Sequence, residues 1–137
     1  IGDVIDTGSA HRDMGASTFA SGLYLVITTS TEIITGGVAG TIKFQLVSDA
    51  QAAIATDGSA SVHFDTGTFV TDDSAANSAE LNAGGKIACI ALPLEGRVYE
   101  RYLGILAVVA TTTVTAGAIN AFLTQTPPAW AAYPDGI

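Results

Sequence analysis

Side chains in residues 41–48 alternate between apolar and polar, and this pattern constrains the fold more than any other stretch of the chain. The two sets are Ile42, Phe44 and Leu46 on one side and Lys43, Gln45 and Val47 on the other. A period of two places successive side chains on opposite faces of a β-strand. The segment therefore predicts a strand that turns one face toward a hydrophobic core.

Several other runs have the composition of strands, rich in β-branched, aromatic and aliphatic residues. They are residues 22–29, 61–64, 67–70, 86–92, 101–110 and 113–124. Glycine pairs such as Gly84-Gly85 mark turns between them. Short strands joined by regular turns predict an all-β sandwich or barrel. We expect residues 86–92 to be buried on both faces and Gly117 to mark a bulge, whereas residues 49–55 fit either a short helix or a loop.

The C-terminal segment differs from the rest of the chain. Residues 125–137 contain three of the four prolines and the single tryptophan. Adjacent prolines impose an extended path that cannot continue a sheet. We therefore divide the chain into a β-sandwich domain over residues 1–124 and an extended arm over residues 125–137. In one interpretation the arm docks on another surface through Trp130 and Tyr133; in the other it is a disordered terminus.

The charge balance excludes some classes of partner. The 137 residues are 48% hydrophobic and only 13% charged, with a net charge of −8. Nucleic-acid binding needs clusters of Lys and Arg, and the sequence has none. The longest apolar run, residues 102–110, is too short to cross a bilayer. Small neutral surface residues instead suit contact with other protein subunits, because no charge is desolvated there.

A charged turn over residues 93–104 runs directly into an apolar strand and holds the candidate interface residues. Arg97, Glu100 and Arg101 lie in it, and we expect the arginines to pair with Glu95 or Glu100 or with a neighbouring subunit. Arginine suits such pairs because its guanidinium binds a carboxylate through two parallel hydrogen bonds. The alternative is a solvated loop with one or two weak surface pairs.

The sharpest sequence signal for an enzyme is Asp6-Thr7-Gly8, whose core returns at residues 65–67. Apolar-Asp-Thr-Gly is the signature of aspartic proteases, in which two carboxylates share a proton. The same tripeptide is ordinary turn chemistry, and we favour that interpretation. No metal-ligand spacing or phosphate-binding loop is present. Cys89, the single cysteine, lies in an apolar run and predicts a buried structural thiol.

Several segments, taken in order, resemble the capsid cement (decoration) proteins of short-tailed phages, the family typified by a Bordetella podophage. The segments are Val4-Ile5-Asp6, Arg12-Asp13-Met14-Gly15, Leu23-Tyr24-Leu25-Val26, residues 44–50, Leu92-Pro93 through Glu100-Arg101-Tyr102-Leu103, and residues 114–119. The Leu-Pro and Glu-Arg-Tyr-Leu stretch is the most specific, and the resemblance spans residues 3–123. The arm beyond Leu123 departs from the family pattern. A further N-terminal segment precedes Val4 in the family; because this chain opens on Ile1, we expect processing or a missing segment.

The resemblance implies a jelly-roll-like antiparallel β-sandwich that sits as a homotrimer on the outside of a phage head and clamps the major capsid protein. From it we expect a structural virion protein on the capsid exterior, with no catalytic, cofactor or metal site and no nucleic-acid or membrane partner. Two other functions stay open at this point. One is a different β-sandwich virion module, in a tail or fibre, and the other is an aspartic protease that uses Asp6.

Overall fold

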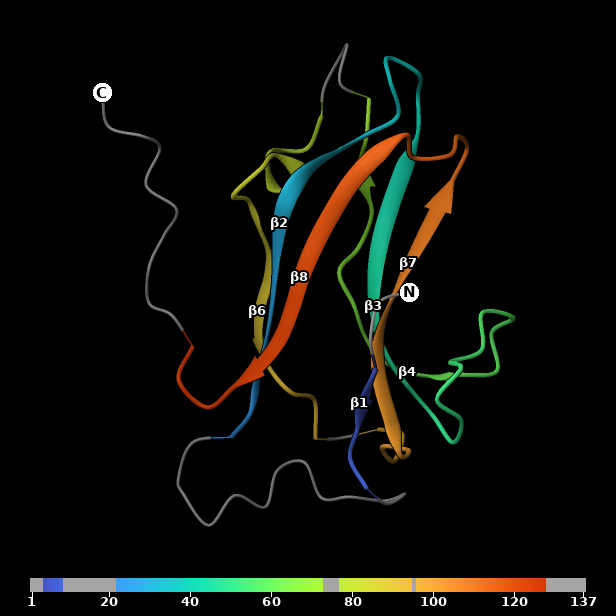
Figure 1. Ribbon diagram of the computed structural model, residues 1–137, viewed down its shortest axis with the longest axis vertical. Coiled ribbons are helices and arrows are strands. Elements are labelled where there is room, and N and C mark those ends of the chain that lie inside the picture. Colours follow the sequence, from blue (N-terminus) through green and yellow to red (C-terminus); the bar gives the residue numbers. More distant parts are fainter. Residues whose placement is uncertain (1–3, 9–21, 73–76, 95, 128–137) are drawn as a thin grey trace.

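The computed structural model describes residues 4–8, 22–72, 77–94 and 96–127, and these form two packed β-sheets (Figure 1). The strands are β1 (Ile5–Asp6), β2 (Tyr24–Ile34), β3 (Thr41–Asp49), β4 (Ser61–Asp65), β5 (Phe69–Val70), β6 (Lys86–Ala91), β7 (Tyr102–Ala110) and β8 (Ala116–Thr124). One 3-10 turn, η1 (Ala79–Leu81), lies between β5 and β6. The all-β prediction is confirmed.

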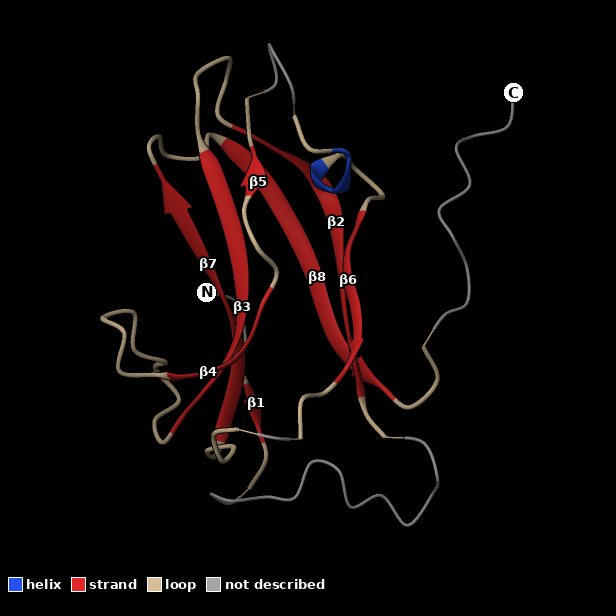
Figure 2. Cartoon of the chain, turned by 180° about the vertical axis from the view of Figure 1, so that it is seen from behind, coloured by secondary structure: helices blue, strands red, loops and turns tan. Residues whose placement is uncertain are grey.

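The two sheets are antiparallel throughout and pack as a sandwich (Figure 2). The five-stranded sheet has the order β1-β7-β3-β4, with β5 also paired to β3, and the three-stranded sheet has the order β6-β2-β8. Strands β1 to β3 and β5 to β8 alternate between the sheets. Because each crossing carries the chain from one layer to the other, segments far apart in sequence become neighbours in one core.

Strand β3 behaves as its alternation predicts. Ile42, Phe44 and Leu46 are 5%, 2% and 1% exposed and pack in the main core between the sheets. Val47 lies on the opposite face, as expected, but it is fully buried there by Ile54 and Ala60 of the loop after β3. The alternation shows which way Val47 points; it carries no information about a loop that folds over it.

The choice left open for residues 49–55 is settled by the structure: Asp49 ends β3, and residues 50–55 form a loop and no helix. The Asp49 carboxylate accepts backbone N–H groups from Gln51 at 3.1 Å and Ala55 at 2.9 Å. Those two hydrogen bonds lower the pKa of Asp49 and turn the chain back on itself. The aspartate therefore shapes a loop instead of capping a helix.

The prediction that residues 86–92 are buried on both faces is wrong. The strand β6 lies at the edge of the three-stranded sheet, and Lys86 and Ala91 at its two ends are exposed. Its apolar run packs one face on the core through Ala88, while Cys89 is only partly buried. A short apolar run does not distinguish an edge strand from a central one, because periodicity reports the faces of a strand and not its edges.

The irregularity expected at Gly117 is present. The pairing of β2 with β8 shifts register between Thr29 and Thr31 and again between Thr31 and Ile34. Gly117 lies opposite this stretch with a backbone φ of 147°, and an added Cβ would stand 2.7 Å from the side chain of Ile33. Glycine is required here for both the backbone angle and the close approach.

Candidate functional site: an uncharged cleft on the open flank

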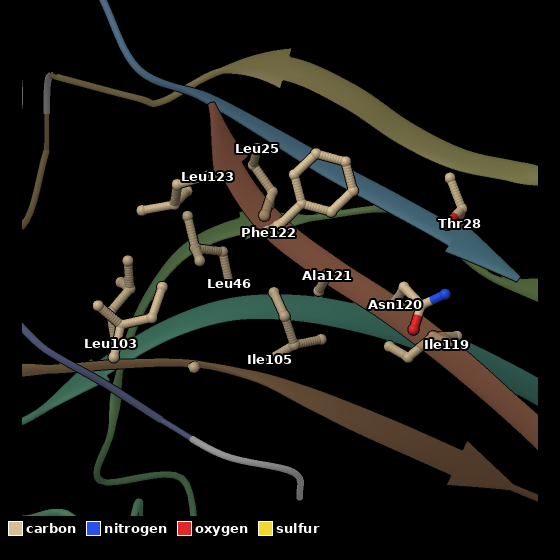
Figure 3. Close-up of a pocket in the computed structure, with 12 residues that line it drawn as sticks. Leu25, Thr28, Leu46, Leu103, Ile105, Ile119, Asn120, Ala121, Phe122 and Leu123 are labelled. Carbon is tan, nitrogen blue, oxygen red and sulfur yellow. The ribbon is translucent and has the colours of Figure 1, made fainter. Parts of the chain in front are cut away.

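An open cleft lies between the two sheets where β7 faces β8 (Figure 3). Its volume is about 670 Å³. Its aliphatic lining comes from both sheets: Leu25, Leu46, Leu103, Ile105, Ile119 and Leu123. In Figure 3 the side chains of Leu46 and Leu123, from opposite sheets, point toward one another across it. We call this hollow the flank cleft.

A second hollow of about 270 Å³ adjoins the flank cleft and shares Ile105 and Ile119 with it. Its other lining residues include Ile33, Phe44 and Val109. The two hollows together follow β7 and β8 along the side of the sandwich. This flank is therefore apolar over much of its length and incompletely closed by the residues that the structure describes.

The flank carries no charge. Between Tyr102 and Asp135 the sequence contains no Asp, Glu, Lys, Arg or His. Strand β7 and strand β8 both fall inside this stretch, and the outer half of β7 together with most of β8 is exposed. A surface of this kind contacts another protein without removing charges from water. This charge-free stretch can be seen in the sequence, but there it indicates only strands. The fold shows that its two strands, β7 and β8, lie on either side of one cleft.

Near the end of the cleft where β1 meets β7, Arg101 forms an ion pair with Asp6. The Arg101 Nε and Nη2 atoms donate to the two carboxylate oxygens of Asp6, each at 2.9 Å. Asp6 was not among the partners predicted for Arg101. Of those partners, Glu100 is engaged elsewhere, Glu95 lies outside the described residues, and a neighbouring subunit is not part of the structure. Both side chains are 45% exposed, and the guanidinium also lies 5.1 Å from the ring centre of Tyr102. The hydrogen bond from Arg101, assisted by the Gly8 backbone N–H, lowers the pKa of Asp6 to about 2.

Glu100 has different partners from those predicted. Its carboxylate accepts a hydrogen bond from the Ser61 hydroxyl at 2.8 Å, and its backbone N–H donates to the Ser48 hydroxyl oxygen at 3.0 Å. Ser48 is fully buried and lies 2.7 Å from Nε2 of His63. The Ser48 hydroxyl has two acceptor lone pairs and one proton, so while it accepts from Glu100 it can either donate to an unprotonated Nε2 of His63 or accept from a protonated one.

The imidazole of His63 stacks on Tyr99, with ring centres 3.8 Å apart and planes 16° apart. Burial lowers the pKa of His63; the negative charge of Glu100 opposes this shift and the positive charge of Arg97 adds to it. The Tyr99 hydroxyl donates to the carbonyl of Pro93 at 2.8 Å, and burial raises the pKa of Tyr99 to about 12. These contacts anchor the turn before β7 to β3 and β4. No sequence motif pointed to His63 or Tyr99.

Arg97 lies at the exposed tip of this turn beside two exposed aliphatic side chains. Leu94 is 67% and Val98 is 56% exposed, and within the described part of the chain no hydrogen bond or ion pair joins Arg97 to another residue. Arg97 is therefore exposed and available for contact with another protein, and it stays an interface candidate. Trp130 and Tyr133, the two candidates in the arm, lie outside the described residues.

The two Asp-Thr-Gly segments adopt the same local geometry. The carboxylates of Asp6 and Asp65 accept the backbone N–H of Gly8 at 2.8 Å and of Gly67 at 2.9 Å. Asp65 also binds Lys43 Nζ at 2.7 Å, and hydrogen bonds from Lys43 and Gln45 lower the pKa of Asp65 to about 2. A pair of carboxylates that shares a proton requires one raised pKa. Here each carboxylate is paired with its own cation, and it accepts the backbone N–H two residues on, as an aspartate does in an Asx turn.

Among the described residues, no group of three or more His, Cys, Asp and Glu side chains is placed to hold a metal ion. None of the helical segments found there has the length and apolar character of a membrane span.

A protein-family model described as Bbp16 matches residues 1–123. The match ends within β8, one residue before Thr124, so the Pro/Trp arm lies beyond it. No curated protein matches the chain.

Proposed function

The chain belongs to the Bbp16 family, a Bordetella phage protein family, and from this premise we propose that it is a capsid cement protein that binds the outside of a phage head. The family match supports a phage protein. Among the described residues, the segments that carry the resemblance to cement proteins include Val4-Ile5-Asp6 at β1 and Glu100-Arg101-Tyr102-Leu103 at the start of β7. Residues 12–15, which also carry it, lie outside the described residues.

The observation that carries the proposal is the uncharged flank. A cement protein has to add contact area between coat subunits, and contact area is gained most easily where no charge is desolvated. The flank formed by β7 and β8 offers apolar and small neutral groups over two nine-residue strands. The Asp, Glu, Lys, Arg and His residues of the chain all lie before Leu103 or after Pro134.

We propose the major capsid protein as the partner and a homotrimer as the assembly. Closed cyclic symmetry lets identical subunits bury part of the uncharged surface and leave the rest of it for the coat, while the acidic remainder stays in water. With a net charge of −8 the chain is repelled by the phosphate backbone, which favours a place outside the shell, away from the packaged genome. The work we propose is structural, and neither Asp6 nor Asp65 takes a catalytic part in it.

The test is attachment to heads. Phage heads that lack the chain are mixed with the purified protein and sedimented, and heads and tails are recovered separately. We expect a saturable amount of protein on the heads and an increase in the temperature at which they release DNA. Recovery with tails or fibres would support the other virion module, and recovery with neither would overturn a role in the particle.

A further inference from the structure

Strand β8 has an unusually unprotected edge. Proteins guard exposed sheet edges with charged residues, prolines or very short strands. Strand β4 carries His63 and Asp65, β6 begins with Lys86, and β1 has two residues. By contrast β8 runs for nine residues without a charge or a proline, and among the described residues it pairs only with β2.

The free part of this edge coincides with the flank cleft. Opposite it, among the described residues, the β7 edge is covered by β1 at Tyr102 and Leu103 only. On the other side, residues 119–123 of β8 border the cleft and leave their outer edge without a described partner. An extended peptide that joined this edge would gain backbone hydrogen bonds from β8 and place alternate side chains in an apolar hollow of about 670 Å³.

The C-terminal segment of the chain itself has the length and composition to pair with this free edge of β8. Pro128 and Pro134 bracket a five-residue run, Ala129-Trp130-Ala131-Ala132-Tyr133, in which every residue keeps its backbone N–H. Five residues is a typical strand length and equals the free stretch 119–123. The run has no charge, as the flank has none. Because side chains alternate along a strand, Trp130 and Ala132 would face the cleft and Tyr133 would face away.

We propose that the C-terminal segment of one copy adds as a strand to the β8 edge of a second copy and inserts Trp130 into its flank cleft. This inference rests on the proposed self-association. A second copy is the occupant because the two adjacent prolines favour an extended path over the reversal that docking on the same β8 requires. The described residues 125–127 also leave β8 on the side away from β7 in both views (Figures 1 and 2).

The experiment follows the fluorescence of Trp130, the single tryptophan, in the full chain in solution, together with the sedimenting mass. We expect its emission to shift to the blue as protein concentration and mass rise together. Ala121→Lys places a cation on the inner side of the docking edge and should abolish both changes. Ala91→Lys is the matched control, because Ala91 is an exposed residue on the opposite edge of the same sheet.

A second pair of variants changes the C-terminal segment instead of the cleft, so that its result does not depend on whether Ala121→Lys folds correctly. Trp130→Ala should lower the mass at a given concentration far more than Tyr133→Ala, because only the tryptophan enters the cleft. The proposal is overturned if the emission is blue-shifted while the sedimenting mass is that of a single chain, which means docking on the same copy, or if Ala121→Lys and Ala91→Lys behave alike. This experiment uses the purified chain without phage heads. Failure to bind heads in the separate attachment test would therefore contradict only the proposed function.

Discussion

The guanidinium of Arg101 holds the carboxylate of Asp6 through two hydrogen bonds of 2.9 Å. Around this pair the Thr7 backbone N–H and hydroxyl both donate to the Arg101 carbonyl, at 2.9 and 2.8 Å. Residues 95 positions apart are thereby joined at one end of the flank cleft. The pair sets where β1 meets β7 and so which part of the β7 edge is covered.

Because the pair is half-exposed, we expect it to contribute modestly to the stability of the isolated chain. Arg101→Ala should lower the urea midpoint of unfolding slightly, and the difference from the parent chain should shrink as salt is added. Arg97→Ala, at an exposed arginine four residues away, is the control and should leave the midpoint unchanged. Equal losses for both variants would contradict the assigned pairing.

Acid should weaken the fold through Asp6 and Asp65. Both carboxyls have an ordinary pKa of 3.8 and a folded-state pKa of about 2. A lowered folded-state pKa gives stability that is complete above about pH 4 and is lost as the pH falls toward about 2. Asp65→Asn should therefore show a smaller loss of the free energy of unfolding across that window. Lys43→Met removes the cation beside Asp65 and should also reduce the loss of stability in acid. If both variants lost as much stability in acid as the parent chain, the Lys43–Asp65 ion pair would be contradicted.

A second pH response is expected near the ordinary pKa of histidine. Burial lowers the pKa of His63 below 6.5, so the unfolded chain binds a proton more readily than the folded chain does. Stability should therefore be complete above about pH 6.5 and should fall as the pH drops below that value. Urea midpoints at pH 7.5 and 5.5 measure this difference.

His63→Gln should lower the stability at pH 7.5, because the stack on Tyr99 is lost, and should reduce the difference between the two pH values. His11→Gln provides the control, since it removes the other histidine of the chain. A pH difference that disappears in His11→Gln and persists in His63→Gln would show that the buried imidazole is not its source.

Gly117→Ala should destabilise the sandwich by about 1–3 kcal/mol, the usual effect of forcing a side chain into a disfavoured backbone region. The backbone φ is 147°, and the new Cβ would lie 3.0 Å from the Cα of Ile33. Gly22→Ala is the matched control, because no atom of the described residues lies within 4 Å of its Cβ position. Thermal unfolding of the two variants gives the comparison, and a Gly117→Ala protein as stable as Gly22→Ala would contradict the observed backbone.

The strands were predictable because their signals are local. The alternation in β3 and the glycine irregularity in β8 depend on neighbouring residues, and both were found. The partner of Arg101 was not predictable in this way. Glu95 and Glu100 are close in sequence, whereas Asp6 approaches only because β1 and β7 are adjacent strands.

The candidate site was hidden for the same reason. A charge-free stretch from Leu103 to Pro134 is plain in the sequence, but two strands within it become a cleft only when they lie in opposite sheets. Ser48, His63 and Tyr99 illustrate the point further, since they come from three separate segments and form one partly buried contact. Such sites arise from topology, which local patterns do not encode.

The measurement that tests the proposed function most directly is a cryo-electron microscopy map of the phage head from which the chain comes. We predict density for the β-sandwich on the outer surface of the shell, in groups related by threefold symmetry and in contact with more than one coat subunit. A shell that lacks this density, or a β-sandwich located on the tail, would contradict the account.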